Sequence, residues 1–157
     1  MNRFYDIPSI LSRELLPWES ERRGLSKTTG FFELAQSFRF RSDIADGDIV
    51  LDVGEVSDLA SIPSAVQWFV MDCDDQRIAG GAWVHDKLFK AGGLIPVYFP
   101  DGSFKKMVQL SFAQCNAILC DEAMPDLFAS KFDRWKVARG LQVGGRSSFK
   151  NSSCTSY

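Results

Sequence analysis

Alternation of apolar and polar residues marks one β-hairpin in the first third of the chain. The alternation is clean at Phe38-Arg39-Phe40-Arg41 and returns over residues 48–53, with the dipeptide Asp46-Gly47 between the two runs. A period of two residues is typical of a strand with one buried face, and Asp-Gly is a preferred hairpin turn. The pattern therefore predicts a β-hairpin over residues 36–53.

Helical spacing follows further along the chain. Ile78, Ala82, His85 and Phe89 are spaced four, three and four residues apart, which places them on one face of a helix. This spacing predicts a helix over residues 76–90, ended by Gly92-Gly93. A short apolar run then predicts a strand or an ordered loop over residues 94–99, followed by a turn at Asp101-Gly102.

Three further helices are expected. One is short and begins near Pro63, the second spans residues 104–124, and the third spans residues 126–143. Pro125 separates the last two, because proline interrupts a helix. Gly80-Gly81 in the 76–90 helix is expected to let another part of the backbone approach closely.

The two ends of the chain lack such patterns. Residues 1–29 are expected to form an irregular arm, in which Pro17 ends any helix, and residues 146–157 a flexible polar tail rich in serine. Residues 30–145 then form a single domain. The expected fold class is α+β, with the arm and the hairpin packed on three to four α-helices.

Composition narrows the function classes. The chain has 157 residues, 45% of them hydrophobic, and a net charge of −2, so no basic field would attract nucleic acid. No apolar run is long enough to predict a membrane span. The four cysteines form no CxxC pair and there is one histidine, so buried thiols are expected and no zinc or other cofactor.

The single histidine is the main candidate for chemistry. His85 lies on the apolar face of its helix, so its ring is expected to be buried and to need a hydrogen-bond partner. Three residues are candidates for that partner. Asp58, in the connector before the helix, is preferred, Asp121 is second, and Asn116 is the third.

A catalytic role would use the same residues. A histidine oriented by a carboxylate acts as a general base on water, and Asp86 could hold a divalent cation such as calcium. His85-Asp86 followed by Leu88-Phe89 looks like the active helix of secreted phospholipases A2, although that family's preceding half-cystine and glycine-rich calcium loop are missing. Ser61 is a candidate nucleophile, but it lacks the GxSxG context, and capping the next helix is its simpler role.

Several blocks together resemble one family of bacteriophage and prophage proteins, the domain of unknown function 1353. The blocks, which span roughly residues 36–146, are Ser57-Asp58-Leu59-Ala60-Ser61-Ile62-Pro63, His85-Asp86-Lys87-Leu88-Phe89, Ala117-Ile118-Leu119 through Glu122-Ala123-Met124, and Trp135 to Gly145. The resemblance implies a phage origin and favours contact between Asp58 and His85, but it implies no reaction. At the family's acidic helix position this chain has Asn116 or Asp121, with a one-residue shift.

Two hypotheses follow. The favoured one is a non-catalytic phage protein, either a virion component or a host-interaction factor, in which Asp58, Ser61, His85 and Asp86 form a buried polar scaffold. Its expected partners are virion proteins or further copies of itself, and its expected location is the host cytoplasm during infection or the virion. The alternative is a small hydrolase of lipid or cell-wall material with His85 as general base and Asp58, Asp86 and Asp121 as orienting or metal-binding carboxylates.

Overall fold

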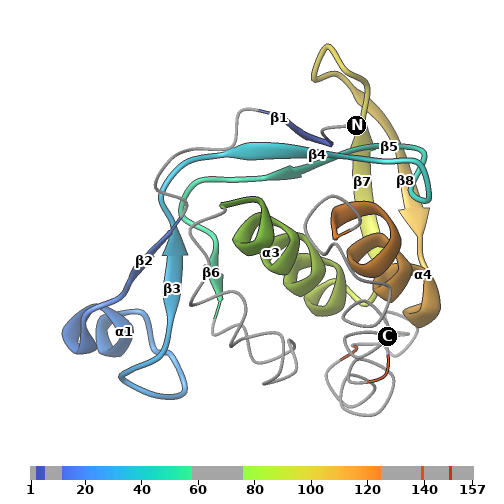
Figure 1. Ribbon diagram of the computed structural model, residues 1–157. Coiled ribbons are helices and arrows are strands. Elements are labelled where there is room, and N and C mark those ends of the chain that lie inside the picture. Colours follow the sequence, from blue (N-terminus) through green and yellow to red (C-terminus); the bar gives the residue numbers. More distant parts are fainter. Residues whose placement is uncertain (1–2, 6–11, 58–75, 125–138, 140–148, 150–157) are drawn as a thin grey trace, which may run out of the picture.

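A computed structural model describes residues 3–5, 12–57, 76–124, 139 and 149. The described chain forms two antiparallel sheets and a group of helices (Figure 1). The five-stranded sheet has the order β1-β4-β5-β7-β8, and the three-stranded sheet has the order β2-β3-β6. The predicted α+β class is confirmed.

The predicted hairpin is present as the centre of the larger sheet. Strands β4 (Phe38–Ser42) and β5 (Gly47–Leu51) pair from Phe38↔Leu51 to Ser42↔Gly47. Phe38 and Phe40 are buried and face the helices, while Arg39 and Arg41 are half-buried on the outer face. In the turn, Asp46 has a φ of 55°, a left-handed conformation that aspartate tolerates better than most residues.

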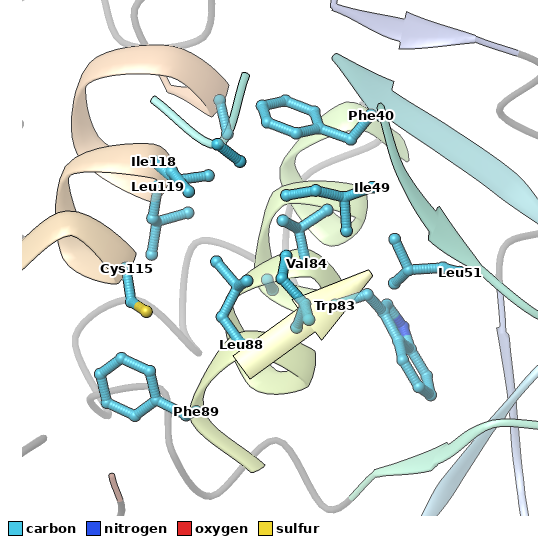
Figure 2. Close-up of a cluster of buried hydrophobic side chains, with 14 of the residues drawn as sticks. Phe40, Ile49, Leu51, Trp83, Val84, Leu88, Phe89, Cys115, Ile118 and Leu119 are labelled. Atoms are coloured by element: carbon cyan, nitrogen blue, oxygen red, sulfur yellow. The ribbon is translucent and has the colours of Figure 1, made fainter. Parts of the chain in front are cut away.

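The predicted helix is also present. Helix α3 (Gln76–Lys90) lies beneath the larger sheet and supplies much of the core (Figure 2). Its burial is wider than one face, because Trp83, Val84 and Asp86 are buried as well as Ala82, His85 and Phe89. At Gly81, an added Cβ would lie 3.2 Å from Cβ of Ala123, so this glycine does allow close packing, against a side chain rather than a backbone.

The end of α3 is closed by glycines, as predicted. Gly92 and Gly93 have positive φ angles, and their N–H groups donate to the carbonyls of Phe89 and Leu88. Gly93 also contacts the backbone of Leu110 so closely that an added Cβ would lie 2.0 Å from its carbonyl oxygen. This contact fixes where α3 ends against the last strand.

The predicted single helix over residues 104–124 is wrong. Residues Phe104–Gln109 form strand β8, which pairs with β7 (Leu94–Tyr98) through the predicted turn at Asp101-Gly102. A helix begins only after Ser111, which caps α4 (Phe112–Ala117) by accepting a hydrogen bond from the backbone N–H of Gln114. A π-helix, η1 (Ile118–Ala123), continues it.

The N-terminal arm contains regular structure, contrary to the prediction. Strand β1 (Phe4–Tyr5) pairs with β4, and β2 (Ser12–Glu14) pairs with β3 (Phe32–Leu34), which also pairs with β6 (Val56–Ser57). Pro17 begins helix α1 (Pro17–Arg22) instead of ending one. Proline is favoured in the first turn because the N–H it lacks would have no helical partner there.

The expected helices near Pro63 and over residues 126–143 lie outside the described residues. So does most of the tail at residues 146–157, except Phe149, whose ring packs at 5.4 Å from Phe89 and 5.6 Å from Phe112. Within the described ranges, no helix has the length and apolar character needed to cross a membrane.

Candidate functional site

His85 lies in the middle of α3, and its side chain is fully enclosed, with 0% exposure. Its Nε2 is 3.0 Å from Oδ1 of Asn116, which is buried in α4. The imidazole packs against the ring of Phe89 one turn later, with centroids 4.0 Å apart. The contact joins two helices that are adjacent in space but separate in sequence.

This geometry fixes the state of the imidazole. Because an amide oxygen only accepts hydrogen bonds, Nε2 is the protonated nitrogen and Nδ1 is an acceptor. Among the described residues, Nδ1 is buried without a hydrogen-bond partner. Burial lowers the pKa of His85 from 6.5 to about 4, and the smaller opposing effects of Asn116 and Asp86 do not offset it. The ring is therefore neutral at pH 7.

Asp86 is buried next to His85 in sequence but belongs to a different contact. Its Oδ2 lies 2.8 Å from Nζ of Lys90, one turn along α3. Lys90 also donates a 3.0 Å hydrogen bond to the carbonyl of Val56 in β6. Asp86 thus takes part in attaching α3 to the smaller sheet. In the part of the chain that the structure describes, no three His, Cys, Asp or Glu side chains are grouped as metal ligands would be.

The remaining predicted site residues are distributed as follows. Asp121 lies on η1 and is exposed, and the hydrogen bond that the structure gives His85 is with Asn116, the third candidate. Asp58 and Ser61 lie outside the described residues. Asp58 and Asp121 therefore remain predictions as partners of the histidine, and Ser61 remains a prediction as a nucleophile.

The cysteines of this region behave as predicted. Cys115 and Cys120 are free and buried, and burial raises the pKa of each thiol to about 12. At neutral pH they are protonated, so neither offers the thiolate that a cysteine nucleophile requires. Cys73 and Cys154 lie outside the described residues.

A second buried polar centre surrounds Glu122 on η1. Its Oε2 accepts a 2.6 Å hydrogen bond from the hydroxyl of Ser42, and its Oε1 accepts from the backbone N–H groups of Asp43 and Ile44, at 2.7 and 3.0 Å. Nη1 of Arg3 lies 3.6 Å from the same Oε1. Glu122 thereby fastens the turn of the β4–β5 hairpin and the N-terminal segment to the helices.

The sequence pattern alone indicates no role for Glu122. Its partners lie about 80 residues earlier, and no local spacing connects a helical glutamate to a distant hairpin turn. Its place in the Glu122-Ala123-Met124 block was the only signal.

These features define an antiparallel α+β protein with two buried polar centres, one at His85 and Asn116 and one at Glu122. The chain belongs to the family described as "Protein of unknown function (DUF1353)", whose model matches residues 32–120, more than half of the chain. No curated protein and no solved structure matches the chain. The matched range includes β3 to α4 and therefore both His85 and Asn116.

Proposed function

We propose that the protein is a non-catalytic, bacteriophage-encoded accessory or virion-associated protein. The observation that carries the non-catalytic part is the enclosure of its only histidine. A general base must reach the proton that it removes. His85 has 0% exposure, and because its pKa is about 4, its ring is neutral at neutral pH.

The partner of the ring supports the same proposal. In acid–base dyads a carboxylate orients the imidazole and stabilises the imidazolium that forms during turnover. Asn116 supplies an amide, which orients the ring but brings no charge. A neutral histidine and a neutral amide suit a permanent link between α3 and α4.

The phage assignment rests on the resemblance of the sequence blocks to phage and prophage proteins. On this proposal the partners are other virion proteins or further copies of the chain. The protein acts in the host cytoplasm during infection or within the particle.

One observation favours a second candidate, a small hydrolase of lipid or cell-wall material. Nδ1 of His85 is an acceptor without a partner among the described residues, which is the state of a base awaiting a proton. In this function His85 is the base, and Asp58, Asp86 and Asp121 orient it or hold a divalent cation such as calcium, with Ser61 as a candidate nucleophile. Asp86 would have to exchange its ion pair with Lys90 for such a cation.

The test replaces His85 by glutamine in the phage. Glutamine offers both a donor and an acceptor but does not titrate near neutral pH, so it can replace a structural hydrogen bond and cannot replace a base. We expect His85→Gln phage to remain infectious, with the chain still present in purified particles if it is a virion component. As a control, Val53→Gln changes a side chain that is 61% exposed and lies outside both buried polar centres.

Two results would count against the proposal. Loss of infectivity by a His85→Gln chain that is folded and normally produced would promote the hydrolase. Release of product from phospholipid vesicles or purified cell wall by the wild-type protein, with or without calcium, would do the same.

A further inference from the structure

In the part of the chain that the structure describes, β8 is an edge strand of the larger sheet. It is six residues long, and β7 is its only neighbour among the described strands. Native proteins usually shield such an edge with charged side chains, proline or short length, because its free backbone groups can pair with another strand. In Figure 1 the β7–β8 hairpin extends beyond the rest of the sheet, and four of the six residues of β8 are exposed.

The charged residues of β8 are directed away from this edge. Lys105 and Lys106 both reach to Asp46 in the β4–β5 turn, with Nζ–carboxylate distances of 2.9 and 2.7 Å. That turn lies on the opposite side of β7 from the edge, since β7 separates β8 from β5. The edge is left with apolar exposed side chains, Phe104 at 58% and Met107 at 51%.

The backbone at Met107 points outward. The N–H of Leu110 donates to the carbonyl of Gly93, just before β7. This hydrogen bond determines which residues of β8 direct their backbone groups towards β7. Since alternate residues of an antiparallel strand point the same way, the N–H and C=O groups of Lys106 and Val108 face β7. Those of Met107 therefore face away from β7.

From these observations we infer that β8 pairs with β8 of a second copy of this chain, antiparallel and centred on Met107. A two-fold axis through the two Met107 residues makes them a hydrogen-bonded pair and opposes Lys106 to Val108 of the other copy. No like charges then face each other, whereas a register centred on Lys106 would oppose two ammonium groups, which is unfavourable. The edge is thus complementary to itself, and pairing joins two five-stranded sheets into one.

The inference does not depend on the proposed phage role, because a dimer can form whether or not the chain enters particles. It is tested by sedimentation velocity of the full chain from micromolar to millimolar concentration. We expect a reversible dimer. Met107→Pro should weaken the dimer about tenfold or more, since it removes the outward N–H from both copies.

Two further variants complete the experiment. Met107→Lys should weaken the dimer to a similar extent by opposing two charges, and it carries the test if the proline variant fails to fold. Val53→Lys is the matched control, because Val53 is 61% exposed, outside β8, and should leave the dimer unchanged. A chain that stays monomeric at millimolar concentration, or a dimer that neither Met107 variant weakens, would overturn the inference.

Discussion

Nε2 of His85 donates to Oδ1 of Asn116 across 3.0 Å, and the two residues are 31 positions apart in sequence. The state of the ring therefore depends on one atom of its partner. Asn116→Asp should raise the pKa of His85 by about one unit or more, because a carboxylate favours the imidazolium that the amide does not. Since His85 is the only histidine, a single set of imidazole NMR resonances reports the titration.

The companion variant Asp86→Asn should move the pKa of His85 slightly in the opposite direction, because Asp86 raises it through charge alone. An Asn116→Asp ring that titrates as in the wild type would show that the contact is absent in solution.

Acidification should destabilise the protein through the same ring. The pKa of His85 is about 4 in the folded protein and 6.5 ordinarily, so above pH 6.5 both states are neutral and the group contributes nothing. As the pH falls from 6.5 towards 4, the unfolded chain takes up a proton that the folded chain does not. The loss of free energy of unfolding approaches about 3 kcal/mol. Urea denaturation at a series of pH values measures it.

His85→Gln should remove this slope. Hydrogen-bonded cations lower the pKa values of Glu19 and Asp46 from 4.5 and 3.8 to about 2, so these carboxylates lose their contributions between those values and not between pH 6.5 and 5. A wild-type stability that is flat between pH 6.5 and 5 would contradict the burial of the histidine.

Glu122→Gln should destabilise the fold by about 1–3 kcal/mol, because the amide keeps one accepting oxygen for Asp43 and Ile44 but leaves the Ser42 hydroxyl without its acceptor, and because it removes the charge that faces Arg3. Chemical denaturation measures the change. Asp121→Asn, the same chemical change at the exposed neighbouring residue, should alter stability by less than about 0.5 kcal/mol. Equal effects of the two substitutions would contradict the conclusion that Glu122 stabilises the hairpin turn.

Gly93→Ala and Gly102→Ala separate backbone strain from crowding. Both glycines have positive φ, 77° and 86°, but a Cβ at Gly102 meets nothing within 4 Å. Gly102→Ala should therefore lose about 1 kcal/mol, the cost of the left-handed conformation. Gly93→Ala adds the collision with Leu110 and should lose about 3 kcal/mol or more. Melting temperatures give the comparison, and similar values for the two variants would contradict the close contact.

The elements with a clean period were predicted well. The two-residue alternation at Phe38–Arg41 reflects burial of one strand face. The helical spacing at Ala82, His85 and Phe89 lies within the wider buried surface of α3. The prediction of a single helix over residues 104–124 failed because Val108, Phe112 and Cys115 have helical spacing although they lie on a strand and, after a loop, on a helix. The capping box formed by Ser111 and Gln114 was the local signal of the true helix start.

The candidate site was predicted only in part. The stripe that contains His85 correctly indicated a buried ring, because burial follows from the local period. The partner depended on how α4 packs on α3, which no spacing within either helix specifies. Asn116 was consequently one of three candidates, and Glu122 was not among the site residues.

The contacts of Glu122 also constrain the order in which the protein can be completed during synthesis. Arg3, near the start of the chain, and the hairpin turn at Ser42 leave the ribosome long before Glu122, which contacts both. Until residue 122 has emerged, the hairpin turn lacks the carboxylate that satisfies its N–H groups. A nascent chain halted before this point therefore holds the β4–β5 turn without the carboxylate that accepts from the N–H groups of Asp43 and Ile44.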